Sequence, residues 1–390
     1  MATSNNQSLF ISADYLPFQM NVPLLNLQAQ YVSIREDLSQ AVQRVLDSQR
    51  FVLAGEVAAL EKSLAEYSNA RFAIGCASGS DALLLALMAL DSKVDDEVIT
   101  TPFSFFATAS AVTRTGARPV FVDIDPETYN LDVAQVENAI TSRTRAIMPV
   151  HLYGQCAEMD PLLELSKQKG VPIVEDAAQA IGSEDRGRRA GSIGLVGCFS
   201  FYPTKNLGGG GDGGMLTTND QEFADRLKRL RAHGGATEYE HSEVGLNSRL
   251  DELQAAILRV KLPHLDQWSD GRANRAARYS ELLKQVDLNF ELRTPFVREE
   301  ARHIFHQYVV RVPRYRDKLM NYLSENGIGT KIYYPIPLHL QQCFSYLGYK
   351  EGAFPEAELA AKETLALPMF PELSDEQQEY VVETIKRFKP

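Results

Sequence analysis

The stretch CFSFYPTKNLGGGGDGG, residues 198–214, places a single lysine, Lys205, between an apolar run and a glycine-rich loop. Residues 198–202 are typical of a short buried strand, which Pro203 ends. Six of the seven residues from 208 to 214 are glycine. Because glycine costs conformational entropy but permits positive φ and close backbone approach to a ligand, this density predicts a loop of unusual geometry beside the lysine.

Two other interpretations of this stretch have to be weighed. An isolated lysine near glycines is usually solvated beside a flexible surface loop. A phosphate loop of the Walker type is excluded, because the lysine precedes the glycines and no Gly-Lys-Ser or Gly-Lys-Thr follows a Gly-x-x-x-x spacer. The function of Lys205 therefore depends on what else the chain places near it.

Two acids end an apolar run upstream of the lysine, in VPIVEDAAQ, residues 171–179. Glu175 and Asp176 stand at the carboxyl end of the predicted strand, the end outside which open α/β sheets bind their ligands. An acid at this place could equally cap the next helix. A lysine for a Schiff base, an aspartate for a pyridinium nitrogen and a small-residue turn for a phosphate, here CASGSDAL at 76–83, would together form a pyridoxal phosphate site.

From about Val22 to the C-terminus, the chain resembles the DegT/DnrJ/StrS group, which are fold-type-I pyridoxal-phosphate aminotransferases of nucleotide-linked keto sugars. The resemblance rests on motifs that stand in the order of the family: ASGSDAL, TPFSFFATA, FVDIDPETYNLD, VEDAAQ, SFYPTKNLGGGGDGG, GLNSRLDELQAAIL and YYPIPLHLQ. Each motif is weak alone, whereas the ordered set is highly specific.

Length and element order predict an α/β protein of two domains. A chain of 390 residues is expected to bury about three quarters of its unfolded surface and to divide. Strands alternate with helices, which predicts βαβ units and a mainly parallel sheet, and the resemblance implies seven strands between helices. We expect an N-terminal extension at 1–20, a large cofactor-binding domain at 21–260 and a smaller α+β domain at 261–390. Ser374 and Gln377 predict a capping box for the last helix.

Composition argues against several classes of partner. Lys+Arg 40 against Asp+Glu 51 gives a net charge of −11, which disfavours nucleic acid and anionic membranes. Four cysteines, at 76, 156, 198 and 343, form no CxxC pair, so we expect no metal site and a reduced, cytoplasmic protein. The first twenty residues lack a basic segment and a long apolar core, and no apolar run reaches membrane length, so neither a signal peptide nor a membrane span is expected.

The phosphate and the face of the cofactor ring have candidates in two segments. A turn that opens a helix offers N–H groups and the positive end of the helix dipole, which makes Gly79 and Ser80, with Asp81 beside them, candidates for the phosphate side. Helix capping alone would give the same pattern. Phe105 lies in an aromatic cluster that a core would explain equally well, and the resemblance implies that this ring stacks on the cofactor.

The resemblance also implies roles around the cofactor ring. Lys205 would carry the resting Schiff base and later move a proton as the free amine. Asp176 would keep the ring nitrogen protonated. Gln179 would donate a hydrogen bond to the ring oxygen, and Ser200 would bind the phosphate.

Substrate contacts and a subunit interface are expected from three further segments. The resemblance implies that Asn247 reaches the cofactor phosphate of the neighbouring subunit and that Arg249 helps to bind its substrate, which requires a homodimer with shared active sites. His151 ends a predicted strand and is a candidate substrate contact, although a lone histidine is more often structural. Tyr333 and His339, in the loop YYPIPLH, are expected to approach the site.

The predicted reaction is a two-step transamination. L-Glutamate gives its amino group to the cofactor, and a keto sugar linked to dTDP or UDP then takes it, which yields an amino sugar for a surface polysaccharide or a natural product. YNLD, HLYGQCAEMD and GLNSRLDELQAAILRVKL resemble the 3-amino enzymes of the family, and a 4-keto sugar is the alternative. Enzymes of 3-keto uronates have a histidine where this chain has Tyr333, which argues against an acidic sugar.

Two alternatives lie outside transamination. A regulator or sensor without enzymatic activity could use the same fold, since fold alone does not determine function, but the presence of both Lys205 and Asp176 weighs against it. A sugar dehydratase of the same family would have histidine in place of Lys205.

Overall fold

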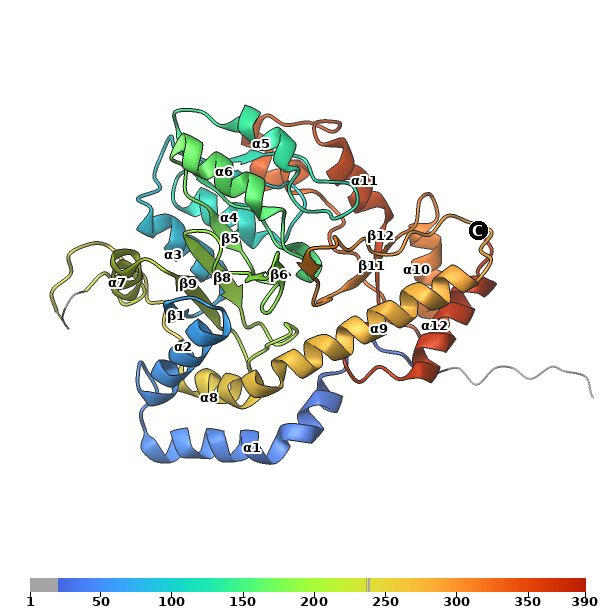
Figure 1. Cartoon of the computed structure of the whole chain (residues 1–390), viewed down its shortest axis with the longest axis horizontal. Helices are drawn as coiled ribbons and strands as arrows, with labels where there is room; N and C mark the ends of the chain where they lie inside the picture. Colours follow the sequence, from blue (N-terminus) through green and yellow to red (C-terminus); the bar gives the residue numbers. More distant parts are fainter. Residues whose placement is uncertain (1–19, 236, 238) are drawn as a thin grey trace, which may run out of the picture.

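The computed structural model describes residues 20–235, 237 and 239–390 (Figure 1). The predicted N-terminal extension, residues 1–20, therefore lies outside the described residues except for Met20. Of the helices within the described ranges, none is both long and apolar enough to cross a membrane.

A mainly parallel sheet forms the centre of the larger part of the molecule, as predicted. Its strands are β1 (Phe72–Cys76), β2 (Glu97–Thr100), β3 (Arg118–Phe121), β4 (Thr144–Ile147), β5 (Val174–Asp176), β8 (Val196–Ser200) and β9 (Gly214–Thr218). They pair in the orders β1-β9-β8-β5 and β3-β2-β4, and the parallel bridges Ile147↔Ile173 and Val150↔Asp176 join the two groups. Only the pairs that β9 makes with β1 and β8 are antiparallel among these strands.

Alternate residues of these strands face opposite layers of helices. Ile74, Val98 and Val174 pack in one core with α3 (Gly79–Ala89), α4 (Ala107–Arg114) and α7 (Gln221–Leu230). On the opposite face, the sheet packs against α2 (Gly55–Tyr67) and α8 (Glu252–Lys261), and against α5 (Val133–Ala139) and α6 (Met159–Lys169). The helices therefore leave the carboxyl edge of the parallel strands to be covered by loops.

α1 (Leu27–Ser48) lies outside α8, along the lower edge of the view in Figure 1. Its buried residues, Ile34, Leu38, Ala41 and Val45, recur every three or four positions and so form one face of the helix. That face packs on Ala256 and Trp268.

The C-terminal part has a core of its own. It contains α9 (Leu265–Gln285), β11 (Tyr308–Arg311), α10 (Arg316–Glu325), α11 (Pro355–Glu363), β12 (Thr364–Leu367) and α12 (Asp375–Arg387). β11 and β12 pair antiparallel, and α9, α10 and α12 cover them in one apolar cluster, which Val22 also joins. The capping box of Ser374 and Gln377 is confirmed at the start of α12. The domain boundary between residues 260 and 261 stays a prediction.

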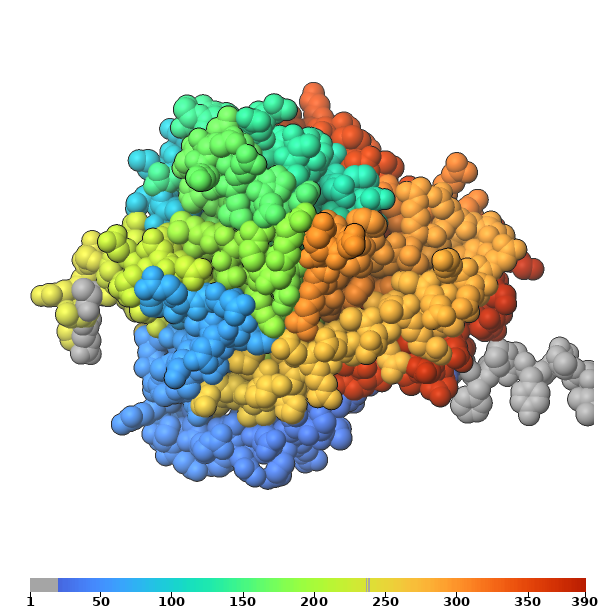
Figure 2. Space-filling view, in the orientation of Figure 1, coloured from blue at the N-terminus to red at the C-terminus, as the bar shows by residue number. Residues whose placement is uncertain are grey.

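A small sheet joins the two parts. β6 (Glu184–Asp185) pairs with β7 (Arg188–Arg189) and with β10 (Ala301–Arg302), so that the orange and green segments touch in Figure 2. Short 3-10 helices occur at Leu152–Gly154, Leu262–His264, Leu338–Leu340 and Gln342–Leu347. The buried Asp185 carboxylate pairs with Arg298, which fixes this junction beside the central sheet.

Candidate active site

Four segments converge at the carboxyl edge of the sheet. Asp176 ends β5 and Ser200 ends β8, while β1 leads into the amino end of α3 at Gly79. The segment after β2 carries Phe105. Because β1, β2, β5 and β8 all run in the same direction, these residues meet at one edge, where ligands of such sheets bind.

Asp176 is a buried carboxylate with partners on both oxygens. The Thr108 hydroxyl donates to Oδ2 at 2.7 Å, and the backbone N–H of Ala178 donates to Oδ1 at 3.3 Å. Burial raises the pKa of Asp176 above its usual value, whereas the bond from Thr108, the N–H of Ala178 and the charge of Lys205 oppose the rise. The hydrogen bonds thus favour the ionised form at a place where desolvation disfavours it.

Lys205 lies half-buried in the turn after β8, where its N–H donates to the carbonyl of Tyr202 at 2.8 Å. Desolvation lowers the pKa of its amine to about 8, although the Asp176 carboxylate acts in the opposite direction. About a tenth of the amine is therefore neutral at pH 7, far more than in an ordinary lysine. This is what a nucleophilic and proton-transferring lysine requires.

Two residues predicted on the phosphate side, Gly79 and Ser200, touch each other. A Cβ added to Gly79 would lie 2.6 Å from the Cβ of Ser200, so only glycine allows the start of α3 to approach the end of β8 this closely. Ser78 caps α3 by accepting from the N–H of Asp81 at 3.1 Å. Ser80, half-buried, lies in the first turn of the same helix, whose dipole favours an anion.

The structure gives another reason for the glycines at 208–214 than the positive φ expected from the sequence. None of these glycines has a positive φ. A Cβ on Gly208 would lie 2.3 Å from the carbonyl oxygen of Pro203, and the Gly210 N–H donates to Gln254 Oε1 at 2.8 Å. Lys261 donates to the Gly208 carbonyl at 2.6 Å. The glycines therefore allow the loop to pack against the lysine turn and α8.

Gln179 and an aromatic pair form another side of the site. Gln179 accepts from the Tyr153 N–H at 2.8 Å through Oε1 and donates to the Tyr334 hydroxyl at 3.0 Å through Nε2. The Phe105 ring is 57% exposed and lies 6.2 Å from the Tyr334 ring, centroid to centroid. An exposed aromatic face at this edge is compatible with a flat ring ligand.

The two histidines predicted as substrate contacts lie in the interior of the chain. The side chain of His151 is fully buried, with Nε2 2.9 Å from Glu175 Oε2, while Nδ1 accepts from the Ala157 N–H at 3.1 Å. His339 is also fully buried, with Nε2 3.0 Å from Glu358 Oε1. Both rings lie below the surface and pair with carboxylates, and their roles as substrate contacts stay predictions. Tyr333 remains half-buried in the same loop.

The segment that precedes α8 places one unforeseen residue beside the start of α3. The Ser248 hydroxyl donates to Asp81 Oδ2 at 2.8 Å and accepts from the Ala77 N–H at 3.1 Å. Its neighbour Asn247 is exposed, and Arg249 is half-buried. No local pattern predicts the role of Ser248, because its partners are about 170 residues away.

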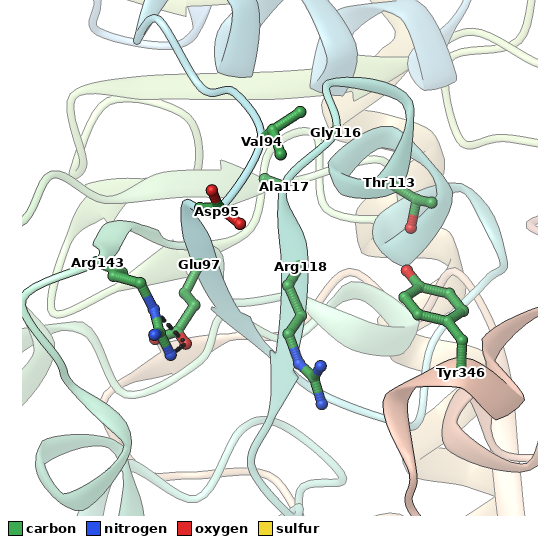
Figure 3. A pocket seen from close by; sticks show the side chains of 9 residues that line it. All are labelled: Val94, Asp95, Glu97, Thr113, Gly116, Ala117, Arg118, Arg143 and Tyr346. Atoms are coloured by element: carbon green, nitrogen blue, oxygen red, sulfur yellow. Dashed lines mark hydrogen bonds and ion pairs between the residues drawn. The ribbon is translucent and has the colours of Figure 1, made fainter.

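A pocket of about 770 Å³ lies elsewhere, at the amino ends of β2 and β3. Figure 3 shows the Arg143 guanidinium against the Glu97 carboxylate at its wall. Since Glu97 and Arg118 begin their strands, this pocket is at the opposite edge from Asp176 and Lys205. It is therefore not part of the candidate active site.

Residues 32–386 match the DegT/DnrJ/EryC1/StrS aminotransferase family. The chain belongs to this family. The match spans all the segments that form the site, so the predicted fold type and enzyme class are confirmed. The family uses pyridoxal phosphate, and solved relatives hold its amine form, PMP.

Three similar proteins illustrate the family. A Geobacillus stearothermophilus protein named a pleiotropic regulatory protein is 52% identical over 95% of this chain and 99% of its own length. An Acidithiobacillus ferrooxidans protein named UDP-N-acetyl-3-dehydro-alpha-D-glucosamine 3-aminotransferase is 44% identical over 94% of this chain and 97% of its own. The crystal structure of S. venezuelae DesV, in complex with a ketimine intermediate, has a TM-score of 0.90 at 43% identity and covers 94% of this chain and 98% of that one.

The residues at the carboxyl edge fit pyridoxal phosphate. Asp176 would face the ring nitrogen, Phe105 the ring plane and Gln179 the ring oxygen, while Gly79, Ser80 and Ser200 would hold the phosphate. The amino end of α3, which lies close to the end of β8, suits a phosphate. The buried Asp176 carboxylate suits a pyridinium nitrogen.

Proposed function

We propose that this protein transfers an amino group from L-glutamate to carbon 3 of a dTDP- or UDP-linked keto sugar. The observation that carries the proposal is that the buried Asp176 carboxylate, at the end of β5, and Lys205, in the turn after β8, lie at the same edge of the sheet. Support for the 3-keto position comes from relatives whose names contain a 3-aminotransferase or a 3-amino sugar. The 4-keto sugar remains an outcome of the test.

The chain's own groups divide the chemistry between them. When bound, pyridoxal phosphate supplies the aldehyde that takes up nitrogen and the ring that accepts the electrons of a carbanion. Lys205 would hold the cofactor through Nζ and, as the free amine, would move a proton to and from the reacting carbon. Asp176 holds the proton on the ring nitrogen with a charge-assisted hydrogen bond, which is worth about 1.5–3 kcal/mol. Phe105 and Gln179 orient the ring.

Two copies of the chain are proposed to share their sites. Asn247 is exposed, and exposed apolar side chains lie on neighbouring segments, among them Tyr202 and Val244. A two-fold interface would bury such side chains and give each site an Asn247 and an Arg249 of the partner. We place the protein in the cytoplasm, because all four cysteines are free thiols.

A panel of sugars tests the proposal. Purified protein is incubated with L-glutamate and with dTDP- and UDP-linked 3-keto and 4-keto sugars, and 2-oxoglutarate and the amino sugar are measured. Formation of a 3-amino sugar supports the proposal. A 4-amino product would show that the amino group goes to carbon 4 instead. One relative is named a pleiotropic regulatory protein and another a sensory transduction protein. If no sugar is aminated while the cofactor still binds, the regulatory or sensory alternative replaces the enzymatic one.

A further inference from the structure

Two buried hydroxyls lie behind the Asp176 carboxylate. Thr108, in the first turn of α4, is fully buried, and its Oγ1 lies 2.7 Å from Asp176 Oδ2. The hydroxyl of Ser104, also buried, lies 2.8 Å from the same Thr108 oxygen. The three side chains thus form a continuous line of hydrogen bonds that ends at the carboxylate.

The chemistry of the three groups determines which one donates and which one accepts in each hydrogen bond. A carboxylate only accepts hydrogen bonds, so the proton on Thr108 Oγ1 points to Asp176. The hydroxyl of Thr108 has then used its only proton, and its contact with Ser104 must be one in which Ser104 donates. Both hydroxyl dipoles therefore point toward the carboxylate, and each bond strengthens the next.

The same turn carries the exposed aromatic ring. Phe105 lies between Ser104 and Thr108 in sequence, and the Thr108 N–H donates to the Phe105 carbonyl at 3.2 Å. One short segment thus fixes both the aromatic face and the hydroxyls behind the carboxylate. The orientation of Asp176 is tied to the place of Phe105.

We propose that Thr108 is a positioning residue that keeps Asp176 ionised and aimed at the ring nitrogen of the cofactor, and that Ser104 reinforces it. The inference rests on the role proposed above for Asp176. Desolvation alone would favour a neutral carboxyl, which could not stabilise a pyridinium N–H. The hydroxyl line supplies a fixed dipole that opposes this without adding a charge next to Lys205.

The test compares the binding of two cofactors to the apoprotein. One is pyridoxal phosphate, and the other is its 1-deaza analogue, in which a C–H replaces the ring nitrogen. Affinities are measured for wild type, Thr108→Val, Thr108→Ser and Ser104→Ala. The matched control is Thr100→Val, which removes a fully buried hydroxyl that donates to the Met148 carbonyl at 2.8 Å and does not contact Asp176.

We expect wild type to prefer pyridoxal phosphate over the analogue and Thr108→Val to lose about tenfold or more of that preference, the size expected for a hydrogen bond to a charged group. Its affinity for the analogue should stay unchanged. Thr108→Ser should restore the preference, Ser104→Ala should lose a smaller part, about two- to fivefold, and Thr100→Val should match wild type.

Two results overturn the inference. If wild type shows no preference, the proposed role of Asp176 fails and the positioning role fails with it. If wild type shows the preference and Thr108→Val keeps it, Asp176 acts without Thr108. Should Thr108→Val not fold, Ser104→Ala decides, because an unchanged preference in that variant contradicts the hydrogen-bond line.

Discussion

The proposed chemistry needs Asp176 to be charged and Lys205 to lose its charge easily, although both lie at the same edge of the sheet. Asp176 has to stay charged although it is buried, which hydrogen bonds from Thr108 and Ala178 favour. Lys205 has to lose its proton easily, and desolvation lowers the pKa of its amine to about 8. Burial acts against the charge of both groups, and hydrogen bonds from Thr108 and Ala178 oppose that effect at Asp176 alone.

The first prediction concerns the pH at which apoprotein captures its cofactor. Capture needs the neutral amine of Lys205, and the neutral fraction grows as pH rises through a pKa of about 8. The capture rate should rise about tenfold per pH unit below that value and level off above it. Stopped-flow absorbance measures this, with N-acetyl-lysine as the control amine. A rate that still rises at pH 10 would mean that Lys205 behaves as an ordinary lysine.

The second prediction separates structure from substrate binding at His151. In the sheet, this ring donates to the Glu175 carboxylate, which also accepts from the N–H groups of Gly191, Ile193 and Gly194. His151→Leu should lower the free energy of unfolding by about 1.5–3 kcal/mol, the value of a hydrogen bond to a charged group. The KM for the sugar should not change. Chemical denaturation and steady-state kinetics check both, and a raised KM with normal stability would restore His151 as a substrate contact.

Single residues were predictable where chemistry and strand position coincide. Asp176 ends β5 and Lys205 lies in the turn after β8, and both carry groups suited to the predicted chemistry, so the sequence alone indicates them as candidates. The same rule selects His151, but a strand end says nothing about which way a side chain points, and this ring is buried against Glu175. No local sequence pattern indicates Thr108 or Ser248, because only the fold brings their partners close to them.

Contacts between elements define the place where α3 meets β8, which is the proposed phosphate end. Gly79 permits that contact because it has no Cβ, and Ser200 occupies the space that a side chain would need. The glycine-rich loop uses the same principle against Pro203 and α8. Close packing of backbones, and not positive φ, explains both.

The third prediction tests this packing with Gly79→Ala. The new Cβ would lie 2.6 Å from the Cβ of Ser200, so α3 has to shift away from β8. Overpacking of this kind costs about 1–3 kcal/mol, and the affinity for pyridoxal phosphate should fall about tenfold or more. Gly55→Ala is the matched control, because a Cβ at the start of α2 meets nothing within 4 Å. Cofactor titration that gives equal affinities for the two variants would contradict the phosphate role of Gly79.

Element boundaries show the limits of sequence reasoning at this scale. The alternation of strands and helices predicts the parallel sheet, and Ser374 with Gln377 predicts the start of α12. The strand predicted at 198–202 is observed at Val196–Ser200, because Phe201 and Tyr202 already belong to the turn that carries Lys205. Apolar side chains continue past the strand end, so hydrophobicity alone misplaces that end.

At the scale of the whole molecule, the positions of Ser248 and Asn247 support the proposed homodimer. Ser248 ties its segment to the phosphate end of its own chain, while the neighbouring Asn247 stays exposed. An exposed amide next to an anchored serine is well placed to serve a second copy of the chain. A subunit isolated from its partner would then have an incomplete site.

The fourth prediction mixes two inactive homodimers, Lys205→Ala and Asn247→Asp, under conditions that exchange subunits. Asn247→Asp should inactivate because a carboxylate repels the phosphate. If Asn247 acts across the interface, each heterodimer has one site with both changes and one with neither. Complete exchange should then restore about a quarter of wild-type activity. Native mass spectrometry confirms heterodimers, and their presence without activity would place Asn247 in its own chain's site.

The most direct test of the account is the rate at which L-glutamate converts the bound cofactor to its amine form. Stopped-flow absorbance follows this single turnover in wild type and in Asp176→Asn, both loaded with pyridoxal phosphate. A neutral amide cannot hold the charge of the ring N–H, so Asp176→Asn should bind the cofactor and react about a hundredfold more slowly or worse. A variant that reacts within about threefold of wild type would contradict the central role of the Asp176 carboxylate.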